Sequence, residues 1–258
     1  MLVEKERKRG LLVDIHNHIL SGLDDGPKSL EEALLLAENA VANGVTHVIA
    51  TPHHKNRRYV NSPLTVKQAA KWLNDELLER SIPLHILCGQ EIYFHNDMLQ
   101  NIERDILCLG DNGKYLLLEL PTNYFPTFIF DILLELQFLG YTPIIVHPER
   151  YNFLKKDKQL GYELVRRGAL FQVNASTILG MNGLSLQRFA KDLIKHNLVH
   201  FIASDAHHYK ERPFLIKEAY KYIQKKFTSQ YVTYFMDNAK HVLEGSFLQP
   251  IPPISFKN

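Results

Sequence analysis

The chain has 258 residues, of which 45% are hydrophobic and 22% are charged, and its formal net charge is +2 at pH 7. This composition is typical of a globular protein with one continuous core, and so small a net charge does not support nucleic-acid binding. No apolar run approaches the length of about 18 residues that a membrane-spanning helix needs. The two cysteines, Cys88 and Cys108, are too few for a disulfide framework.

The two ends of the chain differ in composition from the rest. Residues 1–10 are rich in charge, which we interpret as a flexible extension rather than a secretory signal peptide. We therefore expect a cytoplasmic protein without stable membrane insertion. Residues 246–258 contain three prolines, which favours an extended tail. No linker or internal repeat divides residues 11–245, so we predict one domain there.

Strands and helices alternate along this domain. An apolar strand is expected at 11–16, followed by a Gly- and Pro-containing loop. Ser29 and Glu32 form a capping-box pattern that begins a helix ending at Gly44, and a second strand follows at 45–51. Further strands are expected at 84–88, 114–118, 142–146, 169–173 and 199–203, and helices at 65–80, 96–104, 125–139, 158–167, 184–196 and 213–226, with a helical segment continuing to Gly245.

The alternation indicates an α/β fold built from parallel β/α units. About seven units in a chain of this length favour a closed or nearly closed barrel over an open sheet. The first strand is not followed by G-x-G-x-x-G, which argues against a dinucleotide-binding domain.

Histidines and carboxylates gather where the predicted strands end. His16 and His18 are two positions apart, so both side chains leave the same face of an extended segment. The ends of parallel strands meet at one mouth of a barrel, where active sites of such folds lie. The candidate metal ligands fall on six of the seven strand ends, with one more in the first loop: His16, His18, His53, Glu91, Glu119, His147, Asp205, His207 and, in the loop, Asp25.

This set is too large for one ion, because a tetrahedral zinc site takes about four ligands. A cluster of two or three ions fits the number better. Imidazoles and carboxylates without thiolates suit manganese, zinc or iron, and the share of oxygen ligands favours manganese. Closely spaced ions that share a water are suited to the hydrolysis of phosphate esters.

Cysteine-based phosphatase chemistry is excluded by the sequence. It requires a cysteine followed six positions later by arginine. Phe94 stands six residues after Cys88, and Lys114 stands six residues after Cys108.

Several segments resemble those of a known family, namely D-I-H-N-H, A-T-P-H-H, G-Q-E-I, L-L-E-L, V-H-P-E-R and A-S-D-A-H-H. They are similar to the polymerase-and-histidinol-phosphatase (PHP) superfamily and, more closely, to its bacterial protein-tyrosine phosphatases of the CpsB/YwqE type. The resemblance extends from Leu11 to about Gly245. It implies a distorted (β/α)7 TIM-like barrel, three Mn2+ ions with zinc, iron or cobalt as substitutes, and action on a bacterial tyrosine kinase that controls capsule or exopolysaccharide synthesis.

The resemblance also implies roles for individual residues. The first ion would be held by His16, His18, Glu91 and Asp205, the second by Glu91, Glu119 and His147, and the third by Asp25, His53 and His207. Arg150 and Arg212 would bind phosphate and would be catalytic together with Asp205. We expect His54 and His208 at the surface or supporting the ligands, and Arg57 and Arg58 in a solvated loop.

Three other functions remain open on sequence grounds. A small-molecule phosphatase of the histidinol-phosphatase type would use the same ions, as would a metal-dependent phosphodiesterase or exonuclease. A non-catalytic module that binds phosphotyrosine is the third, although a complete ligand set argues against it.

Overall fold

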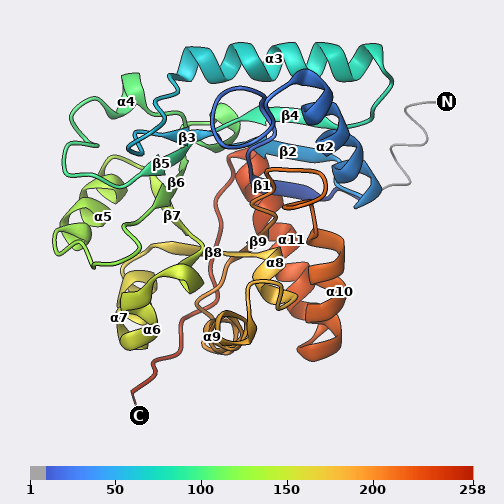
Figure 1. Ribbon diagram of the computed structural model, residues 1–258. Helices are drawn as coiled ribbons and strands as arrows, with labels where there is room; N and C mark the ends of the chain where they lie inside the picture. Colours follow the sequence, from blue (N-terminus) through green and yellow to red (C-terminus); the bar gives the residue numbers. More distant parts are fainter. Residues whose placement is uncertain (1–9, 258) are drawn as a thin grey trace.

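A computed structural model describes residues 10–257, and its strands are all parallel (Figure 1). The N-terminal extension predicted at residues 1–10 lies outside the described residues, apart from Gly10. One sheet has the order β1 (Val13–Asn17), β2 (His47–Ala50), β4 (His85–Cys88), and the other has the order β3 (His53–His54), β5 (Glu91–Tyr93), β6 (Tyr115–Glu119), β7 (Thr142–Val146), β8 (Leu170–Asn174), β9 (Phe201–Ala203).

The two sheets form the seven strand positions of the predicted barrel. β3 continues the path of β2 after Thr51 and Pro52, and β5 continues the path of β4 after Gly89 and Gln90. A proline cannot donate a ladder hydrogen bond and a glycine weakens a strand, which accounts for the interruptions. Between β1 and β9 the ring closes by backbone hydrogen bonds from Asp205 to His16 (2.9 Å) and from His18 to Ala206 (2.8 Å). The prediction of a distorted α/β barrel is confirmed.

Helices surround the strands (Figure 1). They are α2 (Leu30–Ala42), α3 (Pro63–Glu79), α4 (Ile102–Asp105), α5 (Ile129–Phe138), α6 (Asn152–Lys156), α7 (Lys158–Arg166), α8 (Ala175–Ile178), α9 (Leu184–Lys195), α10 (Ile216–Lys226) and α11 (Ser229–Glu244), with 3-10 turns η1 (Leu109–Asp111) and η2 (Pro148–Arg150). None of the helices within residues 10–257 combines the length and apolar character needed to cross a membrane.

Three predicted helices are shorter than expected, since the one predicted at 213–226 also begins late, at Ile216, and two short helices were missed. The helix predicted at 96–104 is reduced to α4, because Asn96, Asp97 and Asn101 favour turns. The helix predicted at 125–139 begins only at Ile129, since Pro126 disfavours helical geometry in the residue before it. α6 and α8 have five and four residues, too few to show a helical period.

The interior of the barrel is apolar at the end where the strands begin. Inward-facing side chains such as Val13, Ile15 and Leu117 form one cluster with Ala239 and Val242 of α11. α11 packs against β1 and β9, so it closes the end of the barrel opposite the carboxyl ends of the strands (Figure 1). The polar strand ends are therefore left at the other mouth.

His200, at the start of β9, makes stability depend on pH. It is fully buried, its Nδ1 accepts a hydrogen bond from the Phe171 N–H at 3.0 Å, and burial lowers its pKa to about 3. The unfolded chain binds this proton below pH about 6.5 while the folded protein does not, so the unfolding free energy decreases as the pH falls from about 6.5 toward 3. The unfolding free energy can be measured by urea unfolding after metal chelation, at pH 7 and at pH 5. We expect its decrease between these pH values to be about 1–2 kcal/mol smaller in His200→Gln than in the unsubstituted protein.

The glutamine keeps an oxygen that can accept from Phe171 but cannot be protonated. An equal loss in the two proteins would show that His200 does not titrate in this range.

Candidate metal centre

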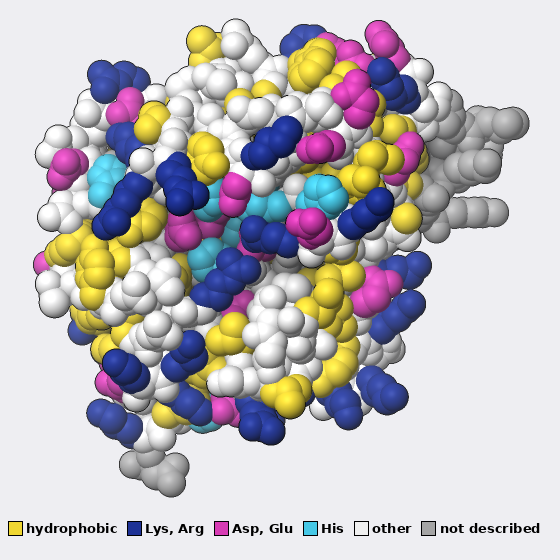
Figure 2. All heavy atoms as spheres, viewed as in Figure 1, with side chains coloured by type: hydrophobic (Ala, Val, Ile, Leu, Met, Phe, Trp, Pro, Cys, Tyr) yellow, Lys and Arg dark blue, Asp and Glu magenta, His cyan; other side chains and the backbone are white. Residues whose placement is uncertain are grey.

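The nine predicted metal ligands lie together at the mouth formed by the carboxyl ends of the strands. Figure 2 shows histidine and acidic side chains in a central hollow that is bordered by lysine and arginine side chains. Six of the ligands are buried, His53 and Glu119 are partly buried, and Asp25 is half exposed. The buried ligands are His16, His18, Glu91, His147, Asp205 and His207.

Glu91 lies at the centre of the cluster. Its Oε2 is 3.4 Å from His16 Nε2, 3.3 Å from His18 Nε2 and 2.9 Å from His53 Nδ1. Its Oε1 is 3.1 Å from His147 Nε2. Burial raises the pKa of Glu91, but the imidazoles of His53 and His16 outweigh this effect and hold the pKa well below its usual range. The carboxylate is therefore ionised and faces several ring nitrogens.

Atoms of seven predicted ligands form three overlapping groups, each within 4.8 Å: His18, Asp25, His53 and His207; His16, His18 and Glu91; and His53, Glu91 and Glu119. The other two, His147 and Asp205, belong to none of these groups but lie 3.1 Å from Glu91 and 3.6 Å from His16. His18, His53 and Glu91 each belong to two groups. The family-based assignment shares only Glu91 between two ions, so the way in which the residues divide among ions remains a prediction. Glu91 Oε2 and His53 Nδ1 are buried and lie 2.9 Å apart, but neither makes a well-aligned hydrogen bond within residues 10–257. A ring nitrogen and a carboxylate oxygen that face each other in this way can both act as ligands of a divalent cation.

Asp205 links the cluster to the two predicted arginines. Its Oδ2 lies 2.9 Å from Arg150 Nη2 and 3.0 Å from Arg212 Nη2, and its Oδ1 lies 3.6 Å from His16 Nε2. The Arg150 and Arg212 side chains are 34% and 41% exposed, so both are partly accessible to solvent. The structure thus places both arginines beside the ligands, as predicted.

Two of the ligands have an unusual backbone. His147 and Asp205 have φ values of 33° and 53°. A residue with a side chain in this left-handed region costs about 1–3 kcal/mol, and such residues concentrate at functional sites. The turn at each strand end thereby directs these side chains toward the mouth.

β8 supplies no direct ligand, and its supporting role was missed. Gln172 Oε1 accepts a hydrogen bond from His16 Nδ1 at 2.7 Å, and Gln172 Nε2 donates to Asn174 Oδ1 at 2.9 Å. Asn174 Nδ2 in turn donates to Asp205 Oδ2 at 2.7 Å. This chain fixes the proton of His16 on Nδ1 and leaves Nε2 for a metal. The sequence did contain a signal for this role, because Gln172 and Asn174 are polar residues two positions apart in an otherwise apolar strand.

Asp24 was also missed, although it adjoins the predicted ligand Asp25. Its Oδ2 accepts from His18 Nδ1 at 2.6 Å, and its Oδ1 accepts from the Gly26 N–H at 2.9 Å. A Cβ atom on Gly26 would lie 2.1 Å from the carbonyl oxygen of His18, so only glycine fits there. The segment D-D-G-P therefore orients the candidate ligand His18 through Asp24 and contains a second candidate ligand, Asp25.

His54 and His208, which the sequence places beside predicted ligands, also lie outside the three groups. His54 is only 2% exposed, so a surface position is wrong for it, and burial lowers its pKa to about 4. His208 accepts hydrogen bonds from the backbone N–H groups of Lys210 and Glu211, which stabilises a turn.

We expect Gln172→Ala to weaken metal binding. The substitution removes the acceptor for His16 Nδ1, and loss of such a supporting hydrogen bond costs about 10- to 100-fold in metal affinity. Calorimetric titration of the chelated protein with Mn2+ measures this change. Gln224→Ala, on the exposed face of α10, is the control and should retain full affinity. Equal affinity in both variants would show that the amide does not support the site.

Comparison with known proteins places the chain in a family. Residues 12–244 match the family model described as capsular polysaccharide synthesis, CpsB/CapC. The chain is 39% identical to the tyrosine-protein phosphatase YwqE of Bacillus subtilis over 246 residues, covering 94% of this chain and 96% of that protein. It is 37% identical to the putative tyrosine-protein phosphatase CapC of Staphylococcus aureus over 247 residues, covering 95% and 97% of the two chains.

Solved structures agree with these relatives. One matching crystal structure comes from a study of YwqE from Bacillus subtilis and CpsB from Streptococcus pneumoniae, which are described there as unique metal-dependent tyrosine phosphatases. The match has a TM-score of 0.92 and 38% sequence identity, and it covers 96% of this chain and 100% of that chain. A histidinol phosphate phosphatase from Lactococcus lactis shares the fold alone, with a TM-score of 0.52 and 13% identity, over 95% of this chain and 97% of that one. The resemblance seen in the sequence motifs is therefore confirmed, and the chain belongs to the CpsB/CapC family.

Proposed function

We propose that this chain is a metal-dependent protein-tyrosine phosphatase whose substrate is a bacterial tyrosine kinase that controls capsule or exopolysaccharide synthesis. The observation that carries the proposal is the gathering of the nine predicted ligands, seven of which form groups that could hold a metal ion, with Arg150 and Arg212 beside Asp205. The names of the relatives support the same activity. A cytoplasmic location is part of the proposal and rests on the sequence.

The proposed cofactor is three Mn2+ ions, with zinc, iron or cobalt as substitutes. Imidazole and carboxylate donors without thiolate fit these metals, and the overlapping groups of donor atoms fit more than one ion. The proposed ligands are the nine residues at the mouth. When bound, the ions would lower the pKa of a water molecule between them and neutralise charge on a phosphoryl group.

The residues of the chain would hold and orient the phosphoryl group. Arg150 and Arg212 both contact Asp205 Oδ2, which fixes the position of the two guanidinium groups. Each guanidinium can make two parallel hydrogen bonds to phosphoryl oxygens. A phenolic leaving group has a pKa near 10, so it needs less proton donation than an alkyl alcohol. This chemistry favours phosphotyrosine over phosphoserine.

A substrate panel with Mn2+ tests the proposal. We expect kcat/KM for a phosphotyrosyl peptide to exceed that for a phosphoseryl peptide, histidinol phosphate or single-stranded DNA by at least about a hundredfold, equivalent to about 2.7 kcal/mol. Faster turnover of histidinol phosphate or DNA would contradict the assignment. Turnover of no substrate by a metal-loaded protein would indicate a binding module instead.

We expect Arg150→Ala to lower kcat/KM for the phosphotyrosyl peptide by about 10- to 100-fold, because it removes one of the two guanidinium groups proposed to bind phosphate. The steady-state rate is measured beside that of Arg188→Ala, which removes an exposed arginine on α9. A rate equal to that of Arg188→Ala would exclude a phosphate-binding role for Arg150.

A further inference from the structure

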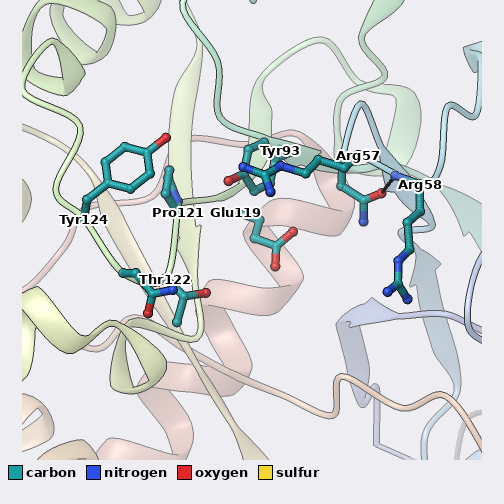
Figure 3. A pocket seen from close by; sticks show the side chains of 9 residues that line it. Arg57, Arg58, Tyr93, Glu119, Pro121, Thr122 and Tyr124 are labelled. Carbon is teal, nitrogen blue, oxygen red and sulfur yellow. Dashed lines mark hydrogen bonds between the residues drawn. The ribbon is translucent and has the colours of Figure 1, made fainter.

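A pocket of about 350 Å³ opens beside the metal centre. Its walls include Arg57, Arg58, Tyr93, Glu119, Pro121 and Tyr124. Figure 3 shows Tyr124 on one side of Glu119 and the two arginines on the other side. The volume lies within the range of about 300–1,000 Å³ that is usual for pockets that bind small groups.

Glu119 connects this pocket to the metal centre. Its Oε2 lies 3.8 Å from His53 Nδ1, its Oε1 lies 4.0 Å from His147 Nε2, and the same side chain lines the pocket. A group bound in the pocket is therefore adjacent to a phosphoryl group held at the ligands. The pocket is the side of the centre where the rest of a phosphotyrosine substrate can extend.

One part of the pocket offers aromatic and apolar surface. Tyr93 ends β5, whereas Pro121 and Tyr124 follow β6. Burial raises the pKa of Tyr93, and the nearby Tyr124 and Glu119 raise it further, which agrees with the position of these groups around one pocket. Aromatic side chains pack favourably against another ring in offset or edge-to-face geometry.

The other part offers positive charge. Arg57 and Arg58 are exposed, and neither guanidinium forms a salt bridge with a carboxylate within residues 10–257. Elsewhere on the surface, arginines such as Arg80 and Arg166 are paired with glutamates of their own helices. The two side chains point in different directions (Figure 3), but both add unpaired positive charge to the wall of the pocket, which favours an acidic group on the substrate.

We propose that this pocket selects the substrate by contacting the phenyl ring of phosphotyrosine through Tyr93, Pro121 and Tyr124, and by binding an acidic side chain next to that phosphotyrosine through Arg57 and Arg58. The proposal rests on the proposed phosphatase function and adds a preferred substrate sequence to it. An aryl phosphate reaches the ligands while its ring fills the pocket, whereas the shorter side chain of phosphoserine leaves the pocket empty.

The charge preference is tested with two phosphotyrosyl peptides that differ only by glutamate or glutamine next to the phosphotyrosine. We expect the unsubstituted protein to favour the glutamate peptide by about three- to tenfold in kcat/KM, as partly solvated charge pairs allow. The double variant Arg57→Ala/Arg58→Ala should reduce this ratio to about one, while Arg188→Ala should preserve it. Equal use of both peptides by the unsubstituted protein, or an unchanged ratio in the double variant, would overturn the proposal.

The ring contact is tested by binding, without turnover. Fluorescence anisotropy measures the Kd of a labelled peptide in which a non-hydrolysable phosphonate replaces the phosphate of phosphotyrosine. We expect Tyr124→Ala to bind about three- to tenfold more weakly and Tyr124→Phe to bind like the unsubstituted protein. Tyr124 is 59% exposed, so its loss should not unfold the chain. Unchanged binding by Tyr124→Ala would overturn the ring contact.

Failure of this proposal differs from failure of the proposed function. If the unsubstituted protein hydrolyses phosphotyrosyl peptides but the variants change neither the ratio nor the Kd, only the role of the pocket is wrong. If it hydrolyses no phosphotyrosyl peptide, the proposed function is wrong and the pocket loses its assigned substrate with it.

Discussion

Glu91→Gln is expected to lower kcat toward a phosphotyrosyl peptide at least about a thousandfold, which corresponds to about 4 kcal/mol of transition-state stabilisation. Both oxygens of the Glu91 carboxylate face imidazoles of the cluster, at 2.9 Å from His53 and 3.1 Å from His147. An amide of the same size keeps the packing but loses the negative charge and one acceptor oxygen. Metal content, measured by elemental analysis after dialysis, should fall together with kcat.

Glu135→Gln is the matched control, because it makes the same chemical change on the exposed face of α5. The melting temperatures of both variants after chelation should show that the chains remain folded. If Glu91→Gln retained both its metal content and its kcat, Glu91 would not be a metal ligand and the proposed centre would be wrong.

The second large effect is a contrast between chelation and thiol alkylation. We expect a chelator to lower activity at least about a hundredfold and added Mn2+ to restore it, because the clustered imidazoles and carboxylates are proposed to hold the cations that the reaction needs. Iodoacetamide should leave most of the activity, since thiolate is the reactive form of cysteine. Burial raises the pKa of Cys108 to about 12, and burial also raises the pKa of the half-buried Cys88.

A Cys88→Ser/Cys108→Ala variant treated with the same reagent controls for reaction at other side chains. Full activity after complete metal removal would contradict metal-dependent hydrolysis. Loss of activity on alkylation of the unsubstituted protein, but not of the double variant, would place a cysteine in the reaction after all.

The fold was largely predictable because its signals are local. Apolar strands such as Thr142–Val146 alternate with helices whose start and end residues are recognisable, as at Ser29, whose side chain accepts a hydrogen bond from the Glu32 N–H. Pro52 and Gly89 interrupt two strand paths, but which neighbouring strands the parts after them pair with is not a local signal. The helices α6 and α8 are too short for a helical period of apolar residues to be recognised, so they could not be predicted.

The convergence of the candidate ligands was predictable for a related reason. Period two places His16 and His18 on one face, and a parallel barrel brings all strand ends together. The supporting residues were not predictable. Gln172 contacts His16 across 156 positions of sequence, and an amide in a buried strand carries no sign of its partner. Those contacts depend on the three-dimensional register of β8 against the rest of the barrel, and so does the orientation of Arg150 toward Asp205.

The hydrogen bonds that close the ring have a consequence for synthesis of the protein. They join the first and last strands, and Ser204 also donates from its N–H to Asp14 Oδ1 across 190 positions. A ribosome therefore releases most of the chain before His16 and Asp205 can meet, since closure waits for contacts distant in sequence. The candidate metal centre can therefore be completed only after β9 and the residues that follow it have been synthesised.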